Sequence, residues 1–341
     1  MKAMVLKQLG AVLDTRQPLE METLPDPEPQ AGQVLIAVLA CGVCHTELDE
    51  IEGRTPPPVL PMIPGHQVVG RVIENGPGAG RFQKGDRVGV AWIFSACGRC
   101  PLCRRGQENL CDQFTATGRD VPGGYAELMT VSEDFAYPIP DRFSDSEAAP
   151  LLCAGAIGYR SLRLTGLQDG QTIGLTGFGA SGHLVLKMVA HRFPNTRVFV
   201  FARSERERVF AHELGAVWSG PAEAASPEKL NCIIDTTPAW KPVVEALKNL
   251  ESGGRLVINA IRKESRDKDA LLALDYSRHL WLEKEIKSVA NVAREDVNGF
   301  LELADALPIV PEVEEFPLHA ANQALVELKE RKIRGAKVLV V

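Results

Sequence analysis

Four of the eight cysteines of this chain lie in one short segment, "CGRCPLCRRGQENLC", at Cys97, Cys100, Cys103 and Cys111. Four thiolates at such spacing complete the tetrahedral shell of a Zn²⁺ ion and leave no position open for a reactant, so the site is structural. An iron–sulfur run also begins C-x₂-C-x₂-C, but it ends with a three-residue gap and Cys-Pro, whereas seven residues separate Cys103 from Cys111. We therefore predict a structural zinc site, with an iron–sulfur cluster, a disulfide or incidental cysteines as the alternatives.

A second group of possible metal ligands is spread along the chain. Cys41 and Cys44 lie in "CGVCHTELDE", His66 lies in "IPGHQVVG" and Cys153 lies in "APLLCAGAIGY". One cysteine, one histidine and one distant cysteine would form a Cys₂His site whose fourth position is open for water or substrate, the pattern of a catalytic zinc. Each residue alone is a weak signal, because a lone buried cysteine usually behaves as a small hydrophobe, as we expect for Cys232 in "LNCIID". The four-cysteine loop strengthens the case for this open site.

A glycine-rich turn in the middle of the chain has the spacing of a dinucleotide-binding loop. The segment "QTIGLTGFGASGHLVLKMVAHRF" reads as an apolar strand, the glycines Gly177, Gly179 and Gly182, and then an amphipathic helix. In this pattern the first glycine permits a tight turn, the second lets the backbone approach a pyrophosphate, and the third lets the helix pack closely on the strand. The amino-terminal end of the helix then favours the anion. We predict a dinucleotide site, the alternative being a glycine-rich turn without a ligand.

The end of the next strand, in "TRVFVFARSERERVF", indicates which dinucleotide binds. NAD-binding units usually carry Asp or Glu about 20 residues after the glycines, where it binds the ribose 2′-hydroxyl. This chain has Ala202, Arg203 and Ser204 there. Ala202 leaves room for a 2′-phosphate, Arg203 offers it a cation and Ser204 a neutral donor. We therefore predict NADP(H) in preference to NAD(H); the alternative is a solvated helix start in which the arginines pair with Glu205 and Glu207.

The elements that must position these residues differ between the two parts of the chain. Before residue 150, short strands such as "QVLIAVLA", "VVGRVIE" and "DRVGVAW" are separated by turns rich in Pro and Gly, as in an irregular, barrel-like β domain. After residue 150, apolar strands such as "KLNCIIDTTP" and "GGRLVINAI" alternate with helical periodicity, as in "AWKPVVEALKNLESGG". This alternation predicts a parallel, doubly wound sheet covered by helices. The fold class is therefore α/β with a β-rich first domain.

The composition excludes several classes of partner. The chain has 341 residues, 45% hydrophobic and 24% charged, with a formal net charge of -6. This length fits two domains, and a weakly acidic protein has no general attraction for nucleic acid or for an anionic membrane. No apolar run approaches the roughly 20 residues of a membrane span, and the first residues lack the apolar core of a signal peptide. We expect a cytoplasmic protein with reduced thiols.

Together these motifs resemble the zinc-dependent medium-chain alcohol dehydrogenase family. The resemblance runs through the whole chain in order, over "CGVCHTELD", "PGHQVVG", the four-cysteine loop, "GGYAE", "APLLCAG", "TGFGASGH" and "RKIRGAKVLV". It implies a GroES-like catalytic domain with both zinc sites over residues 1–152. It also implies a Rossmann domain over 153–290 and a return of the chain to the first domain over 291–341.

The resemblance implies a ligand set for the open metal site. It makes Cys44, His66 and Cys153 the ligands of a catalytic zinc, with Cys41 as a neighbour. The family's "GHE" is "GHQ" in this chain, so Gln67 stands where a carboxylate near the zinc is usual.

The same comparison implies roles for the residues that follow Cys44. Thr46 passes on the alcohol proton, and His45 contacts a cofactor phosphate. Glu47 stands where a carboxylate normally orients the zinc-bound histidine. Asp49 stands where some relatives have a histidine that hands the proton to water, so either Asp49 substitutes for it or the relay ends at the cofactor ribose.

The implied activity is hydride transfer between a primary or secondary alcohol and a nicotinamide cofactor, with two Zn²⁺ per chain. Trp92 and Thr46 would line the alcohol pocket, and Arg334 would reach the cofactor pyrophosphate. The partners are then a small alcohol or aldehyde and no nucleic acid or membrane, and we expect a homo-oligomer, either a dimer or a tetramer. The alternatives are a related reductase of enals or quinones and a non-catalytic NADP(H)-binding sensor.

Overall fold

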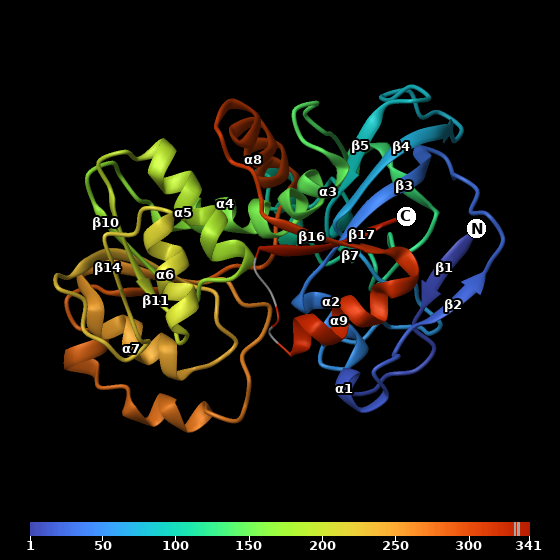
Figure 1. Cartoon of the computed structure of the whole chain (residues 1–341). Helices are drawn as coiled ribbons and strands as arrows, with labels where there is room; N and C mark the ends of the chain where they lie inside the picture. The colour runs from blue at the N-terminus through green and yellow to red at the C-terminus, as the bar shows by residue number, and fades with distance from the viewer. Residues whose placement is uncertain (331, 333–334) are drawn as a thin grey trace. The chain divides into compact units, whose positions relative to one another are not determined.

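The structure is a computed structural model that describes residues 1–330, 332 and 335–341. The chain divides into two units, Met1–Ala156 with Val292–Val341, and Ile157–Asn291 (Figure 1). These boundaries lie a few residues from those that the resemblance implies, and Cys153 belongs to the first unit. All candidate metal ligands therefore lie in the first unit, and the glycine-rich loop lies in the second.

The first unit is built on a seven-stranded sheet around β3 (Gln33–Val43). The main path of the sheet is β16-β17-β3-β4-β5-β9, and β8 also pairs with β3. β3 is longer than the short strand expected from its sequence, because β4, β8 and β17 all pair with parts of it. The remaining bounds are β4 (Val68–Asn75), β5 (Arg87–Val90), β8 (Leu128–Ser132), β9 (Ala136–Pro138), β16 (Val313–Pro317) and β17 (Ala336–Val340).

Smaller elements complete this unit. Two separate pairs of strands are β1 (Lys2–Val5) with β2 (Glu20–Thr23), and β6 (Ile93–Ser95) with β7 (Thr115–Ala116). The helices are α1 (Val12–Thr15), α2 (His45–Ile51), α3 (Asp145–Ala148), α8 (Arg294–Ala306) and α9 (Ala321–Lys329). Short 3₁₀ turns are η1 (Cys103–Arg105), η2 (Glu108–Leu110), η3 (Glu133–Phe135), η4 (Ala149–Leu152) and η7 (Leu318–Ala320).

The last strand, β17, lies beside the candidate zinc ligands. It pairs antiparallel with β3, so Lys337 lies opposite Val43, the residue before Cys44. The Lys337 side chain is fully buried, and its Nζ donates to Glu314 at 2.6 Å and to Glu327 at 2.7 Å. Because a buried ammonium group needs paired charges, these carboxylates of β16 and α9 hold both elements against β17.

The second unit is a parallel, doubly wound sheet, as the alternation of strands and helices predicts. Its order is β12-β11-β10-β13-β14-β15, and neighbouring strands are parallel throughout. The chain runs outward from β10 to β12 and then crosses to β13, so the sheet has its switch point between β10 and β13. The strands are β10 (Thr172–Thr176), β11 (Arg197–Phe201), β12 (Trp218–Gly220), β13 (Leu230–Asp235), β14 (Leu250–Ile258) and β15 (Glu285–Ser288).

The helices of this part of the chain are α4 (Ala154–Thr165), α5 (Ala180–Arg192), α6 (Glu205–Glu213) and α7 (Lys241–Asn249). Two short helical turns follow β14, η5 (Lys268–Ala273) and η6 (Tyr276–Leu280). The first of the helices, α4, crosses the boundary between the two units. The helical pattern in "AWKPVVEALKNLESGG" predicts a helix that continues beyond Asn249, and this predicted end is wrong. The helix α7 stops at Asn249, and Leu250 begins β14 opposite Leu230. Leu250 is buried in the cluster that joins α7 to the sheet. Burial of this leucine against the sheet outweighs its preference for a helix, and Gly253, with φ +72°, fits an irregular strand better than a helix.

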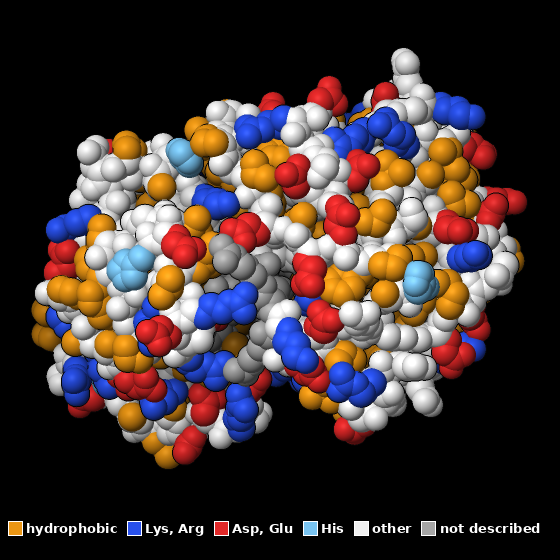
Figure 2. Space-filling view, viewed as in Figure 1, with side chains coloured by type: hydrophobic (Ala, Val, Ile, Leu, Met, Phe, Trp, Pro, Cys, Tyr) orange, Lys and Arg blue, Asp and Glu red, His pale blue; other side chains and the backbone are white. Residues whose placement is uncertain are grey.

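The surface of the molecule carries mixed charges. On the face shown in Figure 2, acidic and basic side chains are interspersed over both units rather than gathered by sign. None of the helices in the described part of the chain is long and apolar enough to span a membrane.

Candidate functional site

The structure brings Cys44, His66 and Cys153 together from three segments of the first unit. Cys44 is the N-cap of α2, His66 precedes β4, and Cys153 lies between η4 and α4. His66 Nε2 lies 3.6 Å from Cys44 Sγ and 3.3 Å from Cys153 Sγ, and all three ligand atoms lie within 4.8 Å of one another. A tetrahedral zinc with bonds of about 2.0 and 2.3 Å would place N and S about 3.6 Å apart. The donor atoms and their spacing therefore fit a zinc ion.

Glu47 connects two of these three residues. One of its oxygens accepts a hydrogen bond from the Cys44 backbone N–H at 2.8 Å, as in a capping box at the start of α2. The other, Oε1, lies 2.5 Å from His66 Nδ1. A carboxylate at Nδ1 favours the tautomer that carries its proton there, which leaves Nε2 free to bind a metal. The residue that starts the helix thus also orients the histidine ring.

The side chains of this cluster perturb one another's ionisation. Burial by itself would lower the pKa of His66, but the charges of Glu47 and Cys44 and the hydrogen bonds with both side chains together outweigh burial and raise this pKa well above its usual range. A hydrogen bond with Cys153 and burial raise the pKa of the Cys44 thiol. Two thiols and a carboxylate this close cannot all ionise without a compensating charge. A bound dication would supply that charge.

A second buried glutamate lies beside the site and was not predicted from the sequence: Glu50, one helical turn after Glu47 on α2. Glu50 is 1% exposed. Burial, and then the charge of Glu47, raise the pKa of Glu50 to about 8. The spacing of three residues between two glutamates on one short helix was the available signal, but the burial of this face could not be read from the sequence. An acidic group thus remains behind the site although Gln67 replaces the usual carboxylate.

Gln67 and Cys41 lie beside the ligands without joining them. Gln67 is 2% exposed and packs against Gly42, where an added Cβ would lie 2.7 Å from the side-chain oxygen of Gln67. Cys41 is fully buried in β3, and its Sγ lies 3.7 Å from the Gly42 carbonyl oxygen. The metal-binding group that the described residues form does not include Cys41.

The other predicted residues of α2 differ in their surroundings. Thr46 is 9% exposed and its backbone N–H donates to Cys44 Sγ at 3.3 Å, whereas His45 is exposed. Asp49 is paired with Arg54, whose Nε donates to Asp49 Oδ1 at 2.5 Å. The Asp49 carboxylate is therefore engaged by Arg54, in the turn that follows α2.

Trp92 lies in an aromatic cluster of the first unit. It is 8% exposed, and its ring centroid lies 4.9 Å from that of Phe114. The Arg119 guanidinium lies 5.4 Å from the Trp92 ring centroid and also pairs with Asp120. The cluster therefore combines a rigid apolar surface with a cation held in place by its carboxylate partner.

The four-cysteine loop forms a second cluster, with all four Sγ atoms within 4.8 Å. Cys97 Sγ and Cys103 Sγ lie 3.9 Å apart, too far for a disulfide and close to the roughly 3.8 Å between sulfurs of a tetrahedral zinc–thiolate site. Backbone amides of Arg99 and Cys100 lower the pKa of Cys97 to about 6, while burial raises the pKa of Cys103 to about 12. A dication would allow all four thiols to ionise.

This loop is anchored to α8 by a charged contact. Glu108, which is 5% exposed, accepts a hydrogen bond from Arg294 Nε at 2.9 Å. The Arg294 guanidinium also lies 4.9 Å from the Phe135 ring centroid. The position of the loop on its unit therefore depends on a contact as well as on the four thiols.

In the second unit, the glycine-rich loop has the expected geometry. Gly177 has φ +83°, a conformation that favours glycine. Gly179 is the N-cap of α5, and an added Cβ there would meet no atom within 4 Å, so the backbone is open to a ligand. At Gly182 an added Cβ would lie 2.9 Å from the Gly177 carbonyl oxygen, which accounts for the third glycine.

The end of β11 is organised by an arginine of α6. Arg208 Nη1 donates to the carbonyl oxygens of Ala202 and Arg203, at 2.9 Å each. Ser204 caps α6, since its Oγ accepts from the Glu207 N–H at 3.1 Å and donates to the Glu207 carboxylate at 2.9 Å. Arg203 is exposed. Of the three residues predicted to bind a 2′-phosphate, Arg203 therefore remains the one with an exposed charged side chain.

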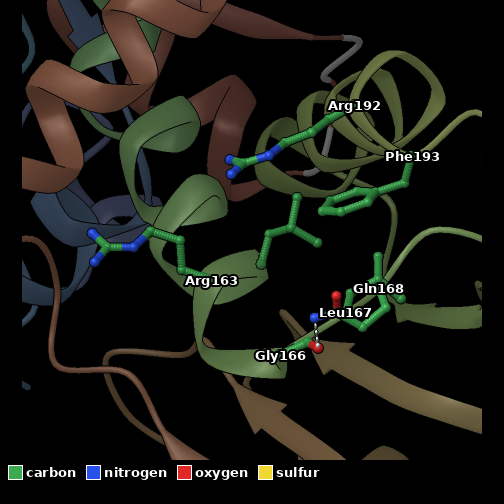
Figure 3. Close-up of a pocket in the computed structure, with 7 residues that line it drawn as sticks. Arg163, Gly166, Leu167, Gln168, Arg192 and Phe193 are labelled. Atoms are coloured by element: carbon green, nitrogen blue, oxygen red, sulfur yellow. Dashed lines mark hydrogen bonds between the residues drawn. The ribbon is translucent and has the colours of Figure 1, made fainter.

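A surface pocket of the second unit is lined by residues outside the glycine-rich loop and the end of β11. It is lined at the carboxyl ends of α4 and α5 by Leu162, Arg163, Gly166, Leu167, Gln168, Arg192 and Phe193 (Figure 3). The Gln168 side-chain amide closes part of it by donating to the Gly166 carbonyl oxygen at 3.1 Å. It contains no candidate metal ligand or nucleophile, and none of the predicted site residues.

The remaining predicted residue, Arg334, lies outside the described residues.

Comparisons with known proteins identify the family. The model of the alcohol dehydrogenase GroES-like domain matches residues 30–141. A probable alcohol dehydrogenase, AdhA, of Mycobacterium tuberculosis (strain CDC 1551 / Oshkosh) is 42% identical over 329 residues, which cover 95% of this chain and 93% of that protein. The chain belongs to the zinc-dependent medium-chain alcohol dehydrogenase family. It is therefore an NAD(P)-dependent oxidoreductase that interconverts alcohols with aldehydes or ketones.

Further known proteins are also similar to this chain over the full length. An alcohol dehydrogenase of Geobacillus stearothermophilus is 33% identical over 350 residues and covers 100% of both chains. Among solved structures, that of AibC matches with a TM-score of 0.88 and 28% identity, over 100% of this chain and 95% of that one. The agreement over both units confirms the predicted fold class.

We predict that Glu47→Gln weakens zinc binding at the Cys44 site. The amide keeps the shape of the side chain but removes the negative charge beside His66 Nδ1. Loss of such an orienting partner typically costs 10- to 100-fold in metal affinity. Competition with a chelator would measure the change, with the exposed Glu28→Gln as the matched control. Equal zinc affinities of Glu47→Gln and the parent would contradict the role of this contact.

We predict that Cys103→Ala lowers the stability of this dehydrogenase, because a closed four-thiolate site contributes folding free energy directly. We expect one zinc fewer per chain and a Tm about 5 °C or more below that of the parent. Calorimetry and zinc analysis would measure both, with Cys232→Ala, a buried cysteine outside the two clusters, as the control. An unchanged Tm after loss of that zinc would show that the loop folds without it.

Proposed function

We propose that this alcohol dehydrogenase uses Cys44, His66 and Cys153 to hold a catalytic zinc. The observation that carries the proposal is the convergence of their ligand atoms within 4.8 Å, with His66 held by Glu47. A relative without metal chemistry would have no need to keep two thiols and an oriented imidazole together. The convergence thus favours the enzyme over a non-catalytic cofactor sensor.

In the proposed mechanism, a zinc ion held by Cys44, His66 and Cys153 would supply Lewis acidity that lowers the pKa of the substrate hydroxyl. Glu47 keeps the His66 ring in the tautomer and orientation that direct Nε2 to the site. Thr46, near the start of α2, accepts the substrate proton and passes it on. Because Asp49 is paired with Arg54, we propose that it holds the turn after α2, and that Thr46 would pass the proton toward the ribose of a bound cofactor.

A nicotinamide cofactor held by the second unit would supply the hydride acceptor for oxidation of the alcohol and the hydride donor for the reverse reduction. We propose that the glycine-rich loop holds its pyrophosphate, since Gly179 leaves the N-terminus of α5 open. The cofactor is NADP(H) in preference to NAD(H), because the end of β11 has Ala202 in place of a carboxylate and the exposed Arg203 beside it. Arg208 keeps the backbone of this turn in place.

We propose a second, structural zinc in the four-cysteine loop, which gives two zinc ions per chain. The support is the tetrahedral spacing of its thiols, with 3.9 Å between Cys97 and Cys103. A site with four protein ligands has no open position, so its role is to hold the loop on its unit.

Cys153→Ser tests the catalytic assignment. We expect turnover to fall on the order of a thousand-fold or more, because Lewis-acid stabilisation of the transition state is worth several kcal/mol. Cofactor binding and the zinc of the four-cysteine loop should remain. The matched control is Cys232→Ser, a buried thiol in β13 that should keep near-parent turnover. If Cys153→Ser turns over saturating alcohol at the parent rate, the zinc assignment is wrong.

Ala202→Asp tests the cofactor preference. The new carboxylate offers an acceptor to a ribose 2′-hydroxyl and repels a 2′-phosphate, so we expect the preference for NADPH to reverse, by roughly ten- to a hundred-fold. The comparison is kcat/KM with NADPH and NADH in the parent, in this variant and in Arg203→Ala. Arg203→Ala should lose activity with NADPH without gaining it with NADH. A parent that uses NADH at least as well as NADPH would refute the proposal.

We also propose that two copies of the chain associate through β15, as in the homo-oligomer expected from the sequence. β15 is at one end of the sheet, its four residues are all exposed, and no described strand pairs with its outer edge. Large apolar side chains of the same region are exposed, namely Leu272, Trp281, Leu282 and Ile286. An exposed edge strand with apolar neighbours is a template for pairing, and a two-fold axis would pair β15 with its own copy.

Ile286→Lys should therefore shift the protein toward a smaller species in sedimentation velocity. A lysine on an edge strand disfavours pairing with another strand. Val217→Lys is the matched control, because Val217 is similarly exposed but lies before β12, at the opposite end of the sheet. An oligomer that is unchanged in Ile286→Lys would place the interface elsewhere.

A further inference from the structure

A buried ion pair joins two loops at the carboxyl edge of the sheet in the second unit. Asp235 is the last residue of β13, and Lys263 lies in the loop after β14. Their side chains are 0% and 8% exposed, and Lys263 Nζ donates to Asp235 Oδ2. The same ammonium group donates to the carbonyl oxygens of Thr237 at 2.7 Å and Ala239 at 3.0 Å. All three donors of the lysine are thus used within the protein.

Further contacts extend the connection between these loops. The Glu264 N–H donates to the Pro238 carbonyl oxygen at 2.7 Å. Asp267 accepts hydrogen bonds from the N–H groups of Trp240 and Lys241, at 2.8 and 2.9 Å, at the start of α7. We call residues 259–267 the clamp, because they hold the connection 235–241 along its whole length.

The held connection borders the glycine-rich loop. Asp235 lies opposite Thr176, the residue before Gly177, and the Thr236 N–H donates to the Thr176 carbonyl oxygen at 2.9 Å. A Cβ added at Gly177 would lie 2.7 Å from Thr236 Oγ1. The connection therefore forms one side of the switch point between β10 and β13, where open parallel sheets bind dinucleotides.

Stability alone does not account for this pair. A buried ion pair often gives no more stability than apolar side chains of the same volume, because both charges lose their hydration. Burial is the main reason that the pKa of Asp235 is raised, and Lys263 opposes that shift. A pair of this kind more readily fixes a conformation than it stabilises a fold.

We propose that Lys263 is a positioning residue for the nicotinamide half of the dinucleotide. This inference rests on the dinucleotide site proposed above. In a doubly wound sheet, each half binds one mononucleotide. The half built from β10, β11 and β12 contains the glycine-rich loop and Arg203, so it takes the adenosine side. The half built from β13, β14 and β15 then takes the nicotinamide side, and the clamp sets the position of its first loop.

The test compares Lys263→Met with the parent by isothermal titration with the reduced cofactor and with ligands that lack the nicotinamide half. These ligands are adenosine 2′,5′-bisphosphate and ADP. We expect the Kd of the complete cofactor to rise about ten-fold and the Kd of the adenosine ligands to change less than two-fold. Lys268→Met, at an exposed lysine outside the clamp, is the control and should leave all these values unchanged.

A double variant, Asp235→Leu with Lys263→Met, separates positioning from folding. Apolar replacement of both charges should restore the Tm to near that of the parent, while the Kd of the complete cofactor stays raised. Recovery of the parent Kd in the double variant would overturn the proposal. A Kd within two-fold of the parent in Lys263→Met would also overturn it, as would a parallel loss for all ligands.

The parent protein provides the remaining distinction. If the parent binds neither the complete cofactor nor the adenosine ligands, the dinucleotide site itself is wrong. If the parent binds both and Lys263→Met does not discriminate between them, only the role of Lys263 is wrong.

Discussion

The contact between Glu47 and His66 is the constraint on which the candidate metal site depends. The carboxylate lies 2.5 Å from the imidazole Nδ1 and accepts the backbone N–H of Cys44 at 2.8 Å. One side chain therefore helps to begin a helix, orients one candidate metal ligand and holds a second candidate ligand at the helix terminus. Residues from three distant segments need such a connection, because nothing in their local sequence fixes the orientation of the imidazole ring relative to the thiols.

The remaining elements of the first unit hold this contact in place. β3 leads into Cys44, β4 follows His66, and η4 leads into Cys153. Gly155, two residues after Cys153, lies so close to Phe300 of α8 that an added Cβ would overlap its ring. The four-cysteine loop is tied to α8 as well, through Glu108 and Arg294. The segments around the site thus share their supports, although they are far apart in the sequence.

Features set by local spacing could be predicted from the sequence. The four-cysteine loop, the strand–turn–helix around Gly177 and the alternation of strands and helices depend on neighbours in the chain, and the structure has them. Features that depend on residues far away in the sequence could not be predicted. The burial of Glu50 depends on how α2 packs, and the end of α7 at Asn249 depends on a place for Leu250 beside Leu230. The ion pair between Asp235 and Lys263 joins two loops that come into contact only after the strands of the sheet have paired.

The pairing of β17 with β3 has a consequence for how the protein is made. The ribosome produces the second unit, Ile157–Asn291, as one uninterrupted segment, but the first unit includes residues from both ends of the chain. The sheet next to Cys44 stays incomplete until β17 has been synthesised, and this part of β3 presents an unpaired edge until then. When β17 docks, the Lys337 ammonium group loses its hydration. This loss is offset only if Glu314 and Glu327 are already in place to pair with it. Nascent chains that lack only the last strand should therefore hold a folded second unit and an aggregation-prone first one.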